Sequence, residues 1–164
     1  MDPGLITPFI SSVQNVFATM LQLPVTVGDA SIKAEPGTTF DVSGIIGMSG
    51  DVVGSVVLSF PKETAERIVS LFTGTTLVVS SPDFADAIGE LVNMVAGGAK
   101  AGFPGNRKVS ISCPSVVIGS GHTVAQRSDV ACIDVPCTTD CGRFSIEIAI
   151  QERKPAAVPV AAKA

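Results

Sequence analysis

The feature that most constrains the fold is the order in which two kinds of apolar pattern follow one another along the chain. Apolar residues recur every three or four positions, as in amphipathic helices, over residues 7–21, 61–74 and 82–102. Short β-rich runs punctuated by Gly, Ser and Asp occupy residues 25–34, 39–50, 51–60, 108–119, 129–137 and 143–152. The order is helix, three strands, two helices, three strands. Such segregation predicts an α+β fold in which two long helices and one short helix pack against an antiparallel sheet.

Local signals predict where these elements begin and end. Thr7 is suited to cap the first helix, with Pro8 at its first position and Pro24 beyond its end. Gly74 sits where a glycine would cap the second helix. We expect the first three β runs to form adjacent antiparallel strands, with a hairpin turn at residues 48–51.

Length and composition predict a single globular domain. The chain has 164 residues, of which 46% are hydrophobic, and this is enough apolar side chain for a substantial core. We assign residues 1–153 to that domain. Residues 154–164 have the Pro, Ala and Lys composition of a disordered tail.

Charge and hydropathy argue against several classes of function. A net charge of −4 and the absence of Trp and Tyr argue against nucleic acid as a partner. The apolar runs are broken well before about 18 residues, and residues 1–7 lack the pattern of a signal peptide, so we expect no membrane span and a cytoplasmic location.

The cysteines and the single histidine do not form a recognisable metal motif. No C-x2-C pair occurs among Cys113, Cys132, Cys137 and Cys141. We interpret them as reduced structural thiols and expect no metal. His122 lies in a Gly/Ser-rich stretch that predicts an exposed loop position.

Polar residues follow one face of the helix predicted at residues 82–102. Spacings of three and four residues place Asp86, Glu90, Asn93, Gly97 and Lys100 on the side opposite the apolar face. The simplest interpretation is a solvated helix face. However, Asn is a poor residue for a helix interior, and Gly costs about 1 kcal/mol relative to Ala there. These two exceptions suggest that a carboxamide is needed on this face and that another surface approaches it closely.

A carboxylate and a carboxamide one helical turn apart make a poor active site by themselves, because no His or metal ligand stands beside them. They could instead complete the site of another protein. A carboxamide both donates and accepts hydrogen bonds, so it can hold a water in line with a phosphoryl group, as the Gln of GTPases does. The carboxylate could pair with a Lys of the partner.

These residues resemble a family signature. The pattern Asp86-x3-Glu90-x2-Asn93, followed by Pro114, resembles the motif of the CheC/CheX/FliY chemotaxis phosphatases, and AIGELVNMVAG is most similar to the CheX type. The resemblance continues through GIIGMSGDVVGSVVLSF and CPSVVIGSG to the last strand. It therefore covers nearly everything except the tail and implies a CheC-like fold.

The resemblance also implies a function. Family members remove the phosphoryl group from the aspartate of a CheY-type response regulator, whose own site holds Mg²⁺, so this chain needs no cofactor. By this resemblance Glu90 would pair with the regulator's active-site Lys, and Asn93 would orient the attacking water. Asp86 and Pro114 would support the site, and Gly97 and Lys100 would lie against the partner.

Two further implications concern assembly and the number of sites. CheC and FliY carry a second Glu-x2-Asn on their first helix, but this chain has no Glu before Glu35, which implies one site per chain. CheX-type members are homodimers, so the resemblance implies a homodimer. The alternative function is a non-catalytic module with the same fold, such as a flagellar-switch-like component or a regulator-binding adaptor.

Overall fold

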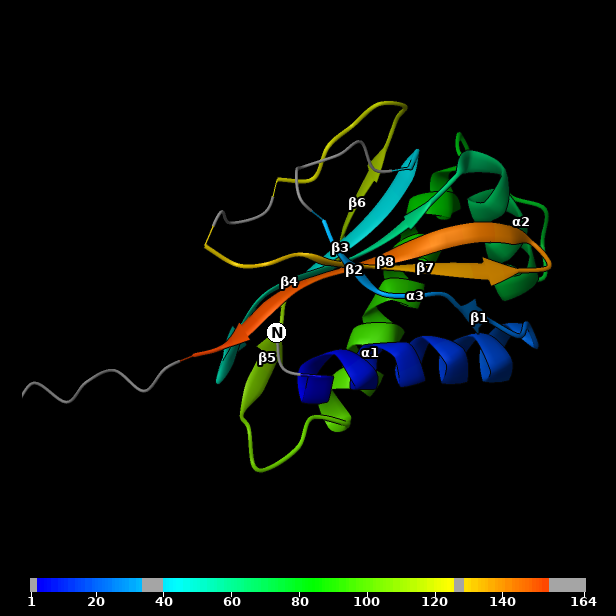
Figure 1. The fold of residues 1–164 in the computed structure, drawn as a ribbon. Helices are drawn as coiled ribbons and strands as arrows, with labels where there is room; N and C mark the ends of the chain where they lie inside the picture. The colour runs from blue at the N-terminus through cyan, green and yellow to red at the C-terminus, as the bar shows by residue number, and fades with distance from the viewer. Residues whose placement is uncertain (1–2, 34–39, 126–128, 154–164) are drawn as a thin grey trace, which may run out of the picture.

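The computed structural model describes residues 3–33, 40–125 and 129–153. The helices are α1 (Pro3–Val16), its π-helical continuation η1 (Phe17–Leu21), α2 (Lys62–Thr73) and α3 (Pro82–Ala101). The strands are β1 (Thr26–Val27), β2 (Ser31–Ile32), β3 (Val42–Gly50), β4 (Val52–Phe60), β5 (Val109–Ile111), β6 (Ser115–Ile118), β7 (Ile133–Thr139) and β8 (Gly142–Glu152). They form one antiparallel sheet in the order β1-β7-β8-β4-β3-β5, with β2 also on β7 and β6 also on β3. The three helices gather on one side of this sheet, which confirms the predicted α+β class (Figure 1).

Two predicted strands are broken in the structure. The run at 25–34 forms only the short strands β1 and β2, because the turn-forming sequence Gly28-Asp29-Ala30 interrupts it. Both strands pair with β7, so the expectation that this run lies beside β3 was wrong.

The run at 108–119 divides into β5 and β6, which both pair with β3. Ile111 lies opposite Met48 and Ser115 opposite Ile45, so the three residues 112–114 face only Ile46 and Gly47. This bulge contains Pro114, which has no N–H to donate to the ladder. By contrast, β3 and β4 form the predicted hairpin, with Gly50 in its turn at φ 101°.

The first helix begins earlier than its sequence predicts. It starts at Pro3, so Thr7 does not cap it and Pro8 lies inside it. Proline is favourable at a helix start, and an internal proline removes one backbone hydrogen bond, which the packing of the helix must offset. The buried residues of this helix and its π-helical turn are Leu5, Phe9, Ser12, Val13, Val16, Phe17 and Leu21.

The segment Pro3–Leu21 is the one described helical stretch that is long and apolar enough to cross a membrane. Length and composition alone give that result, and the core helix of a globular protein passes the same test. Phe9 and Phe17 are fully buried here, and Phe17 stacks on Phe144 of β8 at a ring distance of 5.1 Å. We therefore interpret the segment as a core helix.

Helix α3 packs directly on the middle of the sheet. A Cβ atom at Gly44 of β3 would lie 2.3 Å from Val92 Cγ2, so only glycine lets the helix approach this closely. Helix α2 ends as predicted, with Gly74 in the left-handed conformation and its N–H bonded to Ser70 O. The predicted tail, 154–164, lies outside the described residues.

Candidate functional site

The packing of α3 determines which of its side chains reach solvent. Ser81 stands at its N-cap position and Pro82 at its first position. The side facing the sheet and the other helices consists of the buried residues Phe84, Ala87, Ile88, Gly89, Leu91, Val92, Val95, Ala96 and Ala99. The sequence predicts Phe84, Ala87, Ile88, Leu91, Val92 and Val95 as the apolar face of this helix, and all six are buried. The opposite face must therefore point outward.

The outward face carries the five polar and glycine positions singled out in the sequence. Asp86, Glu90 and Lys100 are exposed, and Asn93 and Gly97 are half-buried. Within the part of the chain that the structure describes, the side chains of Glu90 and Asn93 make no hydrogen bond or ion pair. Their hydrogen-bonding capacity is therefore available to a second molecule.

Pro114 lies behind this face and not on it. It is half-buried, and a Cβ atom at Gly89 would lie 3.3 Å from Pro114 Cγ. The bulge between β5 and β6 thus presses against α3 one residue before Glu90. Pro114 therefore packs behind the turn of α3 that carries Glu90.

A groove between α1 and α3 borders the same face. Its volume is about 730 Å³. The residues that line it are Thr7, Pro8, Ser11, Ser12, Asn15, Val16, Thr19, Asn93, Met94, Gly97, Gly98 and Gly102. Asn93 and Gly97 are thus common to the helix face and the groove. Sequence reasoning missed the contribution of α1, although Ser11 and Asn15 are polar positions on the side of that helix away from its apolar residues.

A close contact between α1 and α3 sets the spacing of the two helices that form the groove. The Ser12 hydroxyl donates a hydrogen bond of 2.7 Å to Val95 O. A Cβ atom at Gly98 would lie 2.4 Å from Ser12 Oγ, so a glycine is required for the helices to meet there. At Gly97, in contrast, an added Cβ would have no neighbour within 4 Å. Gly98 therefore serves packing, whereas Gly97 borders open space.

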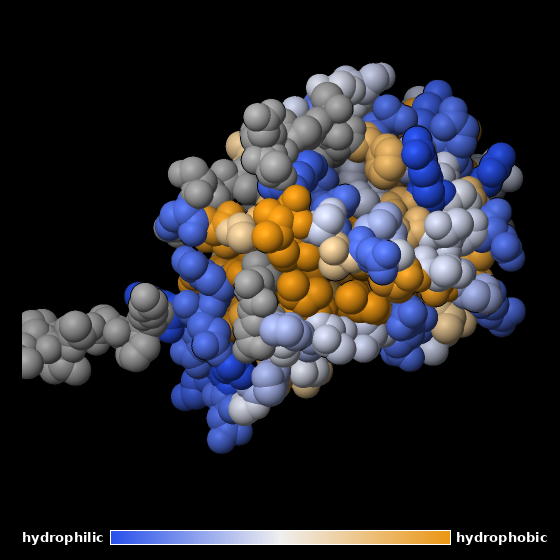
Figure 2. Space-filling view, in the orientation of Figure 1, coloured by the Kyte–Doolittle hydropathy of each residue, from blue (hydrophilic) through white to orange (hydrophobic). Residues whose placement is uncertain are grey.

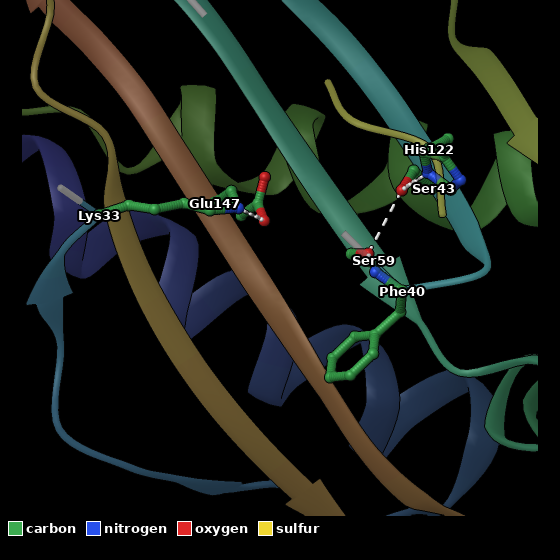
Figure 3. Close-up of polar contacts among 6 residues, drawn as sticks. All are labelled: Lys33, Phe40, Ser43, Ser59, His122 and Glu147. Carbon is green, nitrogen blue, oxygen red and sulfur yellow. Dashed lines mark hydrogen bonds and ion pairs between the residues drawn. The ribbon is translucent and has the colours of Figure 1, made fainter. Parts of the chain in front are cut away.

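The far side of the sheet carries a separate set of polar contacts (Figure 3). Lys33 Nζ lies 2.6 Å from Oε1 of the buried Glu147, which stands opposite Asp134 in the β7–β8 register. Burial raises the pKa of Asp134, although the Lys33 ammonium acts in the opposite direction. This ion pair joins the end of β2 to the middle of the sheet, and we interpret it as structural.

His122 belongs to these contacts and is half-buried, so its predicted exposed position was wrong. Its Nε2 lies 2.8 Å from Ser43 Oγ, and its Nδ1 lies 2.6 Å from Gly119 O. These bonds hold the loop after β6 against the sheet. Ser43 is fully buried and could not reach a substrate as a nucleophile.

The four thiols are free, and three of them are buried. Burial raises the pKa of Cys132 to about 11, with the Glu147 carboxylate adding to the effect, and raises the pKa of Cys137 to about 12. Burial also raises the pKa of Cys141. No three His, Cys, Asp or Glu side chains among residues 3–33, 40–125 and 129–153 are grouped so that they could hold a metal ion.

Comparison with known proteins places this geometry in a family. Residues 42–138 match the family described as chemotaxis phosphatase CheX, a span that contains all of α3 and Pro114. The chain belongs to the CheX family. A CheX family member from Thermotoga maritima, the CheY-P phosphatase CheX, is 32% identical over 122 residues, which cover 73% of this chain and 78% of the relative.

Solved structures show that the likeness extends to the whole CheX-family fold. A CheC-like superfamily protein from Shewanella sp. PV-4 has a TM-score of 0.84 and 33% identity, and the match covers 92% of this chain and 99% of that one. The complex of CheX with CheY, BeF₃ and Mg²⁺ from Borrelia burgdorferi matches with a TM-score of 0.72 and 21% identity, over 90% of this chain and 98% of that one. The predicted CheC-like fold is therefore confirmed.

Proposed function

We propose that this chain dephosphorylates the aspartyl phosphate of a CheY-type response regulator, with Asn93 orienting the attacking water and Glu90 pairing with the regulator's active-site Lys. The observation that carries the proposal is the position of these two side chains. They lie one turn apart on the outward face of α3, and neither has a bonding partner among the described residues. Membership of the CheX family and the known complex of a relative with CheY support the choice of partner.

The chemistry follows from what each group can do. The carboxamide of Asn93 can accept a hydrogen bond from water through Oδ1 and donate one through Nδ2. A water held in this way attacks phosphorus as the bond from phosphorus to the aspartate oxygen breaks, which yields inorganic phosphate and the free aspartate. Positioning of this kind is the main contribution that proteins make to phosphoryl transfer.

The remaining components are supplied by both molecules. Mg²⁺ would come with the regulator, and this chain would need no cofactor of its own; the Borrelia burgdorferi complex of CheX and CheY contains Mg²⁺. Asp86 and Pro114 would support the presenting turn, while Gly97 and Lys100 would lie against the docked partner. Because all four cysteines are free, we place the reaction in a reducing compartment, the cytoplasm.

We also propose that the protein acts as a homodimer. Both margins of the sheet offer exposed apolar side chains, with Ile32 of β2 70% exposed at one and Val117 and Ile118 of β6 37% and 42% exposed at the other. Figure 2 shows apolar surface gathered in the middle of one face, above α1. Exposed strand edges of this kind are templates for pairing with a second copy.

The direct test is phosphate loss from a radiolabelled regulator. A set of receiver domains is phosphorylated, and each is incubated with the wild-type chain, with Asn93→Ala or with Glu90→Ala. Asn93→Ala should lower single-turnover hydrolysis by at least about tenfold and leave regulator binding largely intact, because only the water is released from its position. Its stability should not fall, since Ala is the better helix former.

Glu90→Ala should weaken binding and also slow hydrolysis, because the ion pair docks the regulator and sets the geometry of attack. The difference from wild type should shrink at high salt, where the native pair is itself screened. Asp29→Ala is a matched control, since it removes one exposed carboxylate away from the outward face of α3. Full hydrolysis by both variants would show that Asn93 and Glu90 do not carry the reaction. A wild-type chain that binds a regulator but hydrolyses none would favour the alternative, a non-catalytic CheC-like module.

A further inference from the structure

Besides the outward face of α3, the proposed site has a second wall, on α1. We infer that Asn15 is a positioning residue that hydrogen-bonds the main chain of the regulator segment beside the phosphorylated aspartate, a role that rests on the function proposed above. Asn15 and Asn93 line the same groove from opposite helices. A partner segment that fills this groove beside Asn93 would therefore also border Asn15.

The chemistry of the groove indicates what occupies it. None of its lining residues is charged, in contrast to the carboxylates of Asp86 and Glu90 nearer the start of α3. A charged side chain entering the groove would lose hydration without meeting an opposite charge. Peptide groups are neutral and offer one donor and one acceptor, which is the complement of a carboxamide.

Asn15 is free to make that contact. It is exposed, and within the described residues its carboxamide makes no hydrogen bond. Its main-chain carbonyl accepts a bond of 2.8 Å from the Thr19 hydroxyl, which leaves the side chain unaffected. The carboxamide can therefore bond a docked backbone without first breaking a bond inside the protein.

The groove does not hold a second catalytic pair. No Asp or Glu occurs between residues 3 and 21, so Asn15 has no carboxylate beside it. The residue three positions earlier, Ser12, is buried and bonded to Val95 O. Asn15 therefore contributes to docking, and the water-orienting amide remains Asn93.

The distance between the two walls is fixed by packing. Besides the Ser12 bond, Phe9 of α1 meets Phe103, just beyond α3, edge to face at a ring distance of 5.7 Å. A groove with rigid walls costs little ordering free energy when a partner binds. Asn15 is thus presented at a constant position relative to Asn93.

The test measures binding apart from chemistry. Receiver domains activated with BeF₃⁻ and Mg²⁺ are screened for binding to the wild-type chain by titration calorimetry, and the tightest binder is used throughout. Asn15→Ala should raise the Kd about five- to tenfold, the usual effect of losing one or two neutral hydrogen bonds. With the phosphorylated domain as substrate, its KM should rise in proportion, while kcat at saturation should stay within about twofold of wild type.

Gln14→Ala is the matched control, since Gln14 is an exposed amide on the same helix that does not line the groove, and its Kd should not change. Asn15→Gln should recover part of the affinity. An Asn15→Ala variant that binds as tightly as wild type, or that loses kcat at unchanged KM, would overturn the docking role and leave the proposed phosphatase intact. Asn15→Ala could weaken binding while the wild-type chain hydrolyses no phosphorylated receiver domain. That result would support the docking role of Asn15 and contradict the proposed phosphatase reaction. A wild-type chain that binds no activated receiver domain would overturn both.

Discussion

Replacing Gly97 by Ala should make the protein more stable and less active. Gly97 lies inside α3, and an added Cβ would have no neighbour within 4 Å, so the methyl group meets no steric obstacle in the free protein. Ala is favoured over Gly in a helix interior by about 0.8–1.0 kcal/mol. In a domain of this size that gain corresponds to a rise in Tm of about 2–4 °C.

Gly98→Ala is the matched comparison at the next position. It gains the same helix propensity, but its Cβ would lie 2.4 Å from Ser12 Oγ and would displace the hydroxyl that bonds Val95 O. Overpacking of this kind usually costs about 1–3 kcal/mol. The Tm of Gly98→Ala should therefore lie several degrees below that of Gly97→Ala.

Activity should change in the opposite direction to stability at Gly97. Its methyl group would project into the groove beside Asn93, where we propose that the regulator docks, so KM for the phosphorylated regulator should rise. Calorimetric unfolding and single-turnover phosphate release measure the two effects. An unchanged or lower Tm would contradict the finding that a methyl group fits at position 97. A higher Tm with full activity would show that the regulator does not dock against Gly97.

Three further predictions concern the tail, the thiols and the assembly. Deleting residues 155–164 should leave Tm and turnover nearly unchanged, and a fall of several degrees in Tm would show that the tail docks. Iodoacetamide at pH 9 should modify the exposed Cys113 first, because a thiol whose pKa is raised to about 11, as for Cys132, is only about 1% thiolate at that pH. Equal rates of modification at Cys113 and Cys132 would contradict the effect of burial. Light scattering should give about twice the chain mass of 16.7 kDa. Ile32→Glu should lower that mass if the β2 margin of the sheet forms the dimer contact, and Ile118→Glu should lower it if the β6 margin does. A monomer mass for the wild-type chain at micromolar concentration would contradict the homodimer.

The parts of the fold that could be predicted are those set by local periodicity. Helix α3 was predicted to within one residue, because its apolar face repeats over five turns and Pro82 marks its start. The β3–β4 hairpin followed from the turn at residues 48–51. In both cases the residues that determine the element lie within it.

The features that sequence reasoning missed depend on contacts between distant segments. Nothing local in residues 25–34 indicates that they pair with β7, since strand order is decided by the whole sheet. The groove likewise arises only when Ser12 meets Gly98, two residues far apart in the chain. Asn15 was therefore overlooked, whereas Glu90 and Asn93 were identified because their spacing on one helix is visible in the sequence.

Helix α3 supplies both the centre of the core and the outward face that carries Glu90 and Asn93. Segments so deeply packed open only when the whole domain unfolds, so the amide protons of α3 should exchange at the rate of global unfolding. The two proposed catalytic side chains then stay at a constant spacing as long as the protein is folded. In kinetic terms, the pair does not wait on a rearrangement of α3 before each turnover, and core substitutions should change how much enzyme is present more than how fast each molecule works.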